Sequence, residues 1–245
     1  MNSYYLTDPG KVRTHNEDSV VVMTNENGEK LMIVADGMGG HRSGEIASSI
    51  VVSHVGKSFT DKKQLGTKEE AKEWMKNVIS ESNVLIYKYT IDNPDSMGMG
   101  TTIVMSLITN DYLLFGNIGD SSGYVLKNNH LHKITVDHTL VNLLVKSGEL
   151  TEEEAREHPR RNVLMRALGT NMSVEMDIFD VETDVDGILL CSDGLTNMLN
   201  ESQIERVLLS DSTLEEKVTK LIRKSNVRGG TDNISIACLI KEEGR

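Results

Sequence analysis

Apolar and polar residues follow one another in blocks along this chain, and the period of each block predicts its secondary structure. Residues 19–24 and 30–35 are short apolar runs joined by an Asn-Glu-Asn-Gly stretch, a pattern typical of a β-hairpin. In 44–59 and 68–90 apolar residues recur every three or four positions, which predicts two amphipathic helices. Each helix needs a sheet or another helix to cover its apolar face.

From residue 100 onwards, short apolar runs alternate with pairs of turn-forming residues such as Asn110-Asp111 and Asn128-Asn129. This pattern predicts an antiparallel meander. The charged segment 138–170, interrupted by Pro159, predicts a helical excursion from the body. Beyond it we expect two strands, two helices and a last strand, at 174–183, 187–192, 201–210, 213–226 and 233–240. This order predicts an α+β fold, a four-layer αββα sandwich in which helices flank two packed antiparallel β-sheets.

Length and composition add a few constraints. The 245 residues, 38% of them hydrophobic, are expected to form a single domain over 1–245. A net charge of -11 argues against a nucleic-acid partner. No window approaches the roughly 18 apolar residues of a membrane span, and the first ten residues do not resemble a signal peptide. We therefore expect a cytoplasmic protein without membrane insertion, with a monomer as the default.

The two cysteines do not indicate a functional thiol. Cys191 and Cys238 each lie in an apolar run, as expected of buried residues in a reducing compartment. Position 197 is Asn, so Cys191 does not begin the Cys-x5-Arg loop of a cysteine phosphatase.

Carboxylates at strand ends are the main chemical signal. Singly, an Asp-Gly pair is explained as a turn or a helix cap. Strand ends at one edge of a sandwich converge, however, and several carboxylates there would repel one another unless protonated or neutralised by cations. The residues concerned are Glu17, Asp18, Asp36, Asp120, Asp193 and Asp232.

The ligand types indicate which cation to expect. Oxygen donors without a Cys or His cluster favour Mg²⁺ or Mn²⁺ over zinc. The carbonyl of Gly37 can approach a metal because no side chain intervenes, and Gly39 and Gly40 leave the mouth of the site open. Two such ions about 4 Å apart could share one water, lower its pKa and direct it at phosphorus. The chemistry indicated is hydrolysis of a phosphate ester.

Two basic residues are candidates for substrate chemistry. Arg13 could hold phosphoryl oxygens in a bidentate fork, and without its neighbours in the RTHNED motif a surface arginine would be the better interpretation. His41 could protonate the leaving alkoxide, or it could merely cap the helix that begins near Ser43.

Taken together, the motifs resemble those of the metal-dependent type 2C Ser/Thr protein phosphatases, in particular their compact bacterial members. They occur in the order of that family over nearly the whole chain. The matching segments are RTHNED at 13–18, DGMGGHRSGEIAS at 36–48, GMGTT at 98–102, GNIGDS at 116–121, a segment at 137–169, SDGLTN at 192–197 and GGTDNIS at 229–235.

The resemblance implies a central β-sandwich and a binuclear Mn²⁺ or Mg²⁺ centre. Asp36 would bridge the ions and the Gly37 carbonyl would bind one of them, while Asp193 and Asp232 would bind the other. Glu17 and Asp18 would act through water or nearby.

Further positions follow from the same resemblance. Asp120 with Asp193 matches a third metal position, and Arg13 matches the phosphate-contacting arginine. Residues 137–169, the flap, match a mobile segment beside the site, and we expect Arg160 and Arg161 within it to bind substrate. Two residues depart from the pattern, since Ser122 replaces a usual Arg and Asn197 replaces an Asp that bears on the third ion.

The leading hypothesis is an enzyme, a protein-serine/threonine phosphatase that uses direct attack by a water or hydroxide bridging the two ions. Its partners would be phosphorylated proteins, including a cognate bacterial Ser/Thr kinase that it opposes. The alternatives are a phosphatase dedicated to one regulatory phosphoprotein, of the anti-sigma antagonist type, and a non-catalytic scaffold that binds phosphoproteins. The complete acidic set favours an enzyme.

Overall fold

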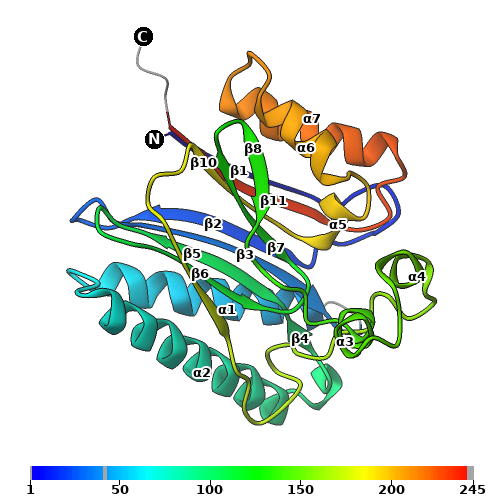
Figure 1. Cartoon of the computed structure of the whole chain (residues 1–245). Coiled ribbons are helices and arrows are strands. Elements are labelled where there is room, and N and C mark those ends of the chain that lie inside the picture. Colours follow the sequence, from blue (N-terminus) through cyan, green and yellow to red (C-terminus); the bar gives the residue numbers. More distant parts are fainter. Residues whose placement is uncertain (1, 41–42, 242–245) are drawn as a thin grey trace.

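The structure, a computed structural model, describes residues 2–40 and 43–241 and contains two antiparallel sheets that face each other (Figure 1). The first sheet has the order β1 (Asn2–Asp8), β11 (Ile234–Ile240), β10 (Gly187–Cys191), β7 (Ser122–Lys127) and β8 (His130–Lys133). The second has the order β2 (Asp18–Thr24), β3 (Lys30–Met38), β5 (Ile103–Ile108), β6 (Leu113–Ile118) and β9 (Asp177–Val181), with β4 (Gly100–Thr101) beside β3.

Helices cover the outer faces of both sheets. The second sheet is covered by α1 (Ser43–Asp61) and α2 (Lys68–Asp92), and α2 leads into the short 3-10 helix η1 (Pro94–Ser96). The first sheet carries α5 (Asp193–Thr196), α6 (Glu201–Leu208) and α7 (Leu214–Val227). This arrangement confirms the predicted αββα sandwich. None of the helices in the described residues is both long and apolar enough to cross a membrane.

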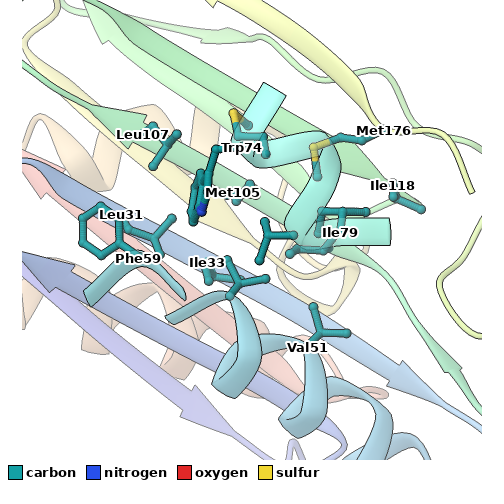
Figure 2. Packing of buried hydrophobic residues seen from close by; sticks show 14 of the residues in the cluster. Leu31, Ile33, Val51, Phe59, Trp74, Ile79, Met105, Leu107, Ile118 and Met176 are labelled. Atoms are coloured by element: carbon teal, nitrogen blue, oxygen red, sulfur yellow. The ribbon is translucent and has the colours of Figure 1, made fainter. Parts of the chain in front are cut away.

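Strand β3 shows why the central strands read as continuous apolar runs. Leu31 and Ile33 pack towards α1 and α2, in the core that Figure 2 shows with Phe59 and Trp74. The alternate side chains, of which Met32 is one, enter the core between the two sheets. Both faces of this strand are therefore covered, and each fully buried aliphatic side chain contributes about 1.5–3 kcal/mol.

The flap contains two short helices at one end of the sandwich (Figure 1). Thr139 caps α3 (Leu140–Ser147), which ends at Gly148 in the left-handed conformation. A capping box that begins at Thr151 starts α4 (Glu152–Glu157). The expectation of a helical excursion is confirmed in these two helices, and neither contains a buried residue.

The strands differ from the prediction at three places. Strand β1 was not predicted, although it pairs with β11 along its full length, from Asn2 opposite Ile240 onwards. The strand predicted at 30–35 continues to Met38, so Asp36 lies within it, opposite Asp18. The strand predicted at 174–183 is shorter and covers only β9.

Candidate active site

Five of the six predicted acidic residues line one cavity of about 380 Å³. Its walls come from several separated parts of the chain, and the lining residues are Arg13, Glu17, Asp36, Gly37, Met38, Gly39, Thr102, Asp120, Asn162, Leu164, Asp193, Asp232 and Asn233. A larger cavity of about 460 Å³ lies beside α1 and α2, but its carboxylates, those of Glu70, Glu73 and Glu81, are exposed residues. The smaller cavity is thus the one in which acidic side chains are held close together.

Thr101 and Thr102, which follow Gly100 of β4, hold the backbone of Asp36 by hydrogen bonds. The Asp36 N–H donates to Thr102 Oγ1 at 3.0 Å, and the Thr102 N–H donates to the Asp36 carbonyl at 2.8 Å. Thr101 Oγ1 donates to the same carbonyl at 2.9 Å. These three hydrogen bonds fix the main chain of Asp36, from which its carboxylate projects.

The neighbouring glycine is required by close packing. A Cβ on Gly37 would lie 2.1 Å from the carbonyl oxygen of Gly44, at the start of α1. A Cβ on Gly44 would in turn meet the Glu17 carboxyl group at 2.8 Å. The strand, the helix and the loop before β2 can therefore approach one another only because these two side chains are absent.

Asp193 and Asp232 reach the cavity from the other sheet. Asp193 follows β10 as the first residue of α5, and its Oδ2 accepts a hydrogen bond from Asn197 Nδ2 at 3.0 Å. Asp232 precedes β11, and its Oδ2 accepts from Arg13 Nη2 at 2.8 Å. Arg13 is half exposed, so this ion pair lies at the rim of the cavity.

Asn233 holds the loop that carries Arg13 and Glu17. Its Oδ1 accepts from the Glu17 N–H at 2.8 Å, and its Nδ2 donates to the carbonyls of Pro9 and His15 at 3.0 and 2.9 Å. One side chain before β11 thus positions a segment more than 200 residues earlier in the chain.

Burial and mutual repulsion make the carboxylates resist ionisation. Burial, followed by the charges of Asp18 and Asp193, raises the pKa of Asp36 well above its usual range. Burial likewise raises the pKa of Asp18 to about 7, that of Asp120 to about 8 and that of Asp193 to about 6. Burial also raises the pKa of Glu17. The cavity would accept positive charge readily.

Two buried oxygens support the same interpretation. Among the described residues, Oδ1 of Asp18 and Oδ1 of Asp193 have no hydrogen-bond partner, and such buried carboxylate oxygens are costly unless a cation or a water satisfies them. The donor set is oxygen throughout, which fits a hard divalent cation. Within residues 2–40 and 43–241, no three carboxylate, imidazole or thiol groups form a ready-made metal site by themselves. Carbonyl or water oxygens would have to complete the coordination.

The predicted site residues are placed unequally. Seven of them line the cavity, namely Arg13, Glu17, Asp36, Gly37, Asp120, Asp193 and Asp232. Asp18 is 7% exposed and lies behind them, with its Oδ2 accepting from Ser192 Oγ at 2.8 Å. Arg160 and Arg161 are exposed on the flap and do not line the cavity, whereas Asn162 and Leu164 do. His41 lies outside the described residues.

Sequence reasoning did not single out Thr102, Ser192 or Asn233 as site residues. Each lies within a quoted motif, namely GMGTT, SDGLTN or GGTDNIS, and this is the signal that could have identified them. Their partners are distant in sequence, so the hydrogen bonds themselves could not be read from local pattern.

Comparison with known proteins gives consistent matches. The family model "Protein phosphatase 2C" matches residues 11–230. A serine/threonine phosphatase of Listeria monocytogenes, stp, is 43% identical over 237 residues, which are 96% of this chain and 94% of that protein. A serine/threonine phosphatase structure from S. agalactiae superposes with a TM-score of 0.93 at 38% identity, covering 98% of this chain and 99% of that one. The Stp1 structure from Staphylococcus aureus has a TM-score of 0.92 at 34% identity, with coverages of 98% and 95%.

Proposed function

The chain belongs to the protein phosphatase 2C family, and from this premise we propose that it is a hydrolase that removes phosphate from phosphoserine and phosphothreonine in proteins. The observation that carries the proposal is the cavity in which Asp36, Asp193 and Asp232 converge beside Arg13. Asp36 and Asp193 have raised pKa values because they are buried together, and bound divalent ions would relieve that repulsion. Metal-assisted phosphate hydrolysis uses such ions together with a positively charged side chain, here Arg13, that can bind the phosphoryl group.

We propose the metal ligands that the family resemblance implies. Asp36 and the Gly37 carbonyl, together with Asp193 and Asp232, would hold two Mn²⁺ or Mg²⁺ ions, with Glu17 and Asp18 contributing through water. Asp120 and Asp193 would hold a third. When bound, such ions supply a water of lowered pKa and positive charge that offsets the charge developing on the phosphoryl group.

The protein's own side chains bind and orient the substrate. Arg13 pairs with Asp232 at the rim, and it can exchange this partner for two phosphoryl oxygens because its guanidinium is half exposed. Thr101 and Thr102 keep the Asp36 backbone in place during turnover. The phosphoryl group passes directly to water, so no covalent phosphoenzyme forms. Arg160 and Arg161 are proposed to contact the protein substrate from the flap, and His41 to protonate the leaving alkoxide.

The proposal extends to partners and setting. The substrates would be phosphorylated proteins, including a cognate Ser/Thr kinase that the enzyme opposes, in the cytoplasm. The whole chain would act as one catalytic domain, with the flap at 137–169. A non-catalytic phosphoprotein scaffold is disfavoured because the acidic set is complete and five of its six members line one cavity.

The test is metal-dependent hydrolysis by the purified protein. Release of phosphate from a phosphothreonine peptide and from p-nitrophenyl phosphate is measured with Mn²⁺ and with EDTA. Asp36→Asn keeps the shape of the side chain and should lower turnover by at least about 100-fold. Asp184→Asn, at a carboxylate that is 90% exposed and paired with Lys241, is the matched control and should retain activity.

Activity that persists in EDTA, or wild-type turnover in Asp36→Asn, would contradict the proposal. A panel of unrelated phosphopeptides separates a broad phosphatase from one dedicated to a single regulatory phosphoprotein. The latter would hydrolyse p-nitrophenyl phosphate yet discriminate sharply within the panel.

A further inference from the structure

His138 lies at the foot of the flap and contacts the turn between β6 and β7. Its side chain is only 7% exposed. The Gly119 N–H donates to His138 Nδ1 at 3.2 Å, and the His138 N–H donates to the Gly119 carbonyl at 2.9 Å. One residue therefore holds both backbone polar groups of Gly119, which directly precedes the cavity residue Asp120.

The turn that His138 holds has little freedom. Gly119 has φ +105, and a Cβ there would lie 2.5 Å from Thr102 Cγ2. The Gly119 carbonyl also accepts from Asn117 Nδ2 at 3.3 Å. Since the Gly119 carbonyl belongs to the peptide unit that leads into Asp120, these contacts determine where the Asp120 carboxylate enters the cavity.

The other ring nitrogen faces an ion pair. His138 Nε2 is 3.0 Å from Asp177 Oδ2, and Arg166 Nη1 donates to Asp177 Oδ1 at 2.7 Å. Because Nδ1 accepts the Gly119 N–H, the ring proton is assigned to Nε2, which donates to Asp177. The 3.4 Å approach of Arg166 Nη1 to Nε2 is then a contact between two donors, and the shorter Asp177 bond prevails.

His138 and Arg166 stand at opposite ends of the flap. The two ends of the flap are paired through their backbones. The Met165 N–H donates to the His138 carbonyl at 2.8 Å, and Thr139 and Leu164 form an isolated antiparallel β-bridge. Both flap ends are therefore fastened to Asp177 at the start of β9, through one imidazole and one guanidinium. The same imidazole reaches the Asp120 turn.

We propose that His138 is a positioning residue that couples the flap to Asp120: Nδ1 and the backbone N–H fix the Asp120 turn, and Nε2 fixes the flap base on Asp177. The consequence for catalysis rests on the proposed function, whereas the coupling itself does not. A cation held by Asp120 then steadies the flap base, and by linkage a displaced flap weakens that cation's binding to the same degree.

Two substitutions separate the two ring contacts. In His138→Asn the amide oxygen stands near the Nδ1 position and can accept from Gly119, but the side chain is too short to reach Asp177. In His138→Gln the amide nitrogen stands near the Nε2 position and can donate to Asp177, while Gly119 loses its acceptor. Asp177→Asn weakens the flap side without altering the ring.

Asp180→Asn is the matched control. Asp180 lies on β9 like Asp177, and its carboxylate is 41% exposed against 39%. Its ion pairs are with Lys68 and Lys72 on α2, away from the flap. Asp180→Asn therefore shows how much the loss of an ordinary ion pair on β9 changes protein stability and hydrogen exchange.

Hydrogen exchange of the flap base and a titration of bound Mn²⁺ by electron paramagnetic resonance provide readouts that need no activity. In the wild type, Mn²⁺ should slow exchange at the Leu140 and Met165 amides. His138→Asn and Asp177→Asn should speed this exchange about fivefold, the effect of one lost hydrogen bond, and abolish its response to Mn²⁺. His138→Gln should instead raise the Mn²⁺ concentration that fills the weakest site about fivefold.

A kinetic split accompanies these changes if the proposed function holds. His138→Asn should raise KM for a phosphopeptide by a larger factor than KM for p-nitrophenyl phosphate, because only the phosphopeptide reaches the flap. The proposal is overturned if both His138 variants match Asp180→Asn in exchange and in Mn²⁺ binding. It is also overturned if His138→Asn and His138→Gln lose flap protection and Mn²⁺ affinity to the same extent, because that result marks a merely structural histidine. Should both His138 variants unfold, Asp177→Asn decides: exchange at the flap base that still responds to Mn²⁺ as in the wild type would overturn the proposal. A wild type without phosphatase activity refutes the function but leaves the exchange test valid.

Discussion

Replacing Asp193 with Asn should make the metal-free protein more stable while removing its stabilisation by metal. Asp193 shares the cavity with Asp36 and Asp232, and burial followed by the charge of Asp232 raises its pKa to about 6. An Asn can keep the hydrogen bond of the carboxyl group, since its amide oxygen can accept from Asn197 Nδ2 as Asp193 Oδ2 does. The change thus removes charge without leaving a void.

The magnitude follows from the pKa of Asp193. A rise from 3.8 to about 6 spans about 2 pH units, each worth about 1.4 kcal/mol, so the buried charge costs the fold about 3 kcal/mol above pH 6. Because the cavity is open to water, we expect about 1–2 kcal/mol to be recovered. For a protein of 245 residues this raises Tm by about 3–6 °C.

The sign of the effect also predicts its pH dependence. The folded protein holds the proton more tightly than the unfolded chain, so the cost appears as pH rises from about 4 to about 6 and is complete above that range. The advantage of Asp193→Asn should therefore be present at pH 7.5 and largely absent near pH 4.

Thermal unfolding followed by circular dichroism tests this reasoning in EDTA and in excess Mn²⁺, with Asp184→Asn as the control. Mn²⁺ should raise the Tm of the wild type by mass action and that of Asp193→Asn little. An equal or lower Tm for Asp193→Asn in EDTA at pH 7.5 would refute the electrostatic argument. A Mn²⁺ response as large as that of the wild type would refute the ligand assignment.

Three further outcomes are expected. The metal-free wild type should lose stability as pH rises from about 4 to about 8, because burial raises the pKa values of Asp18 and Asp120 to about 7 and about 8, and Mn²⁺ should flatten the Tm profile. Arg13→Lys should raise KM for a phosphopeptide about tenfold and change the free energy of unfolding by less than about 0.5 kcal/mol, since it loses the bidentate fork but only a rim ion pair; an unchanged KM would oppose the assigned role. Gly37→Ala should lower Tm and Mn²⁺ affinity because its Cβ meets a carbonyl oxygen of α1 at 2.1 Å, whereas Gly40→Ala, whose Cβ would meet no atom of the described residues within 4 Å, should behave as the wild type in both measurements.

Local signals account for much of the success of the sequence interpretation. The helices α1, α2, α6 and α7 begin and end within two residues of the predicted bounds, because apolar period and capping residues such as Thr67 and Thr213 act over a few neighbouring positions. The same reasoning placed Asp36, Asp120 and Asp193 next to apolar runs, since a strand's apolar pattern is visible without its partners.

Edge strands and flap contacts depend on distant residues and escaped prediction. Strand β1 alternates only weakly, with Tyr4 and Leu6 half buried, and it is held by β11 at the other end of the chain. The interaction of His138 with Asp177 joins residues 39 positions apart, and nothing in the local pattern around either residue indicates the other.

Taken alone, the amino-acid order determined where strands and helices form, which carboxylates stand beside them and what chemistry oxygen donors favour, because these depend on neighbouring residues and on side-chain type. The tertiary structure decided which buried oxygens find no partner in the part of the chain that the structure describes, such as Oδ1 of Asp18 and of Asp193. It also decided how Asn233 and His138 connect distant segments to the cavity. The reason is physical: burial and hydrogen bonding are set by the atoms that surround a group, and here those atoms come from segments that only folding brings together.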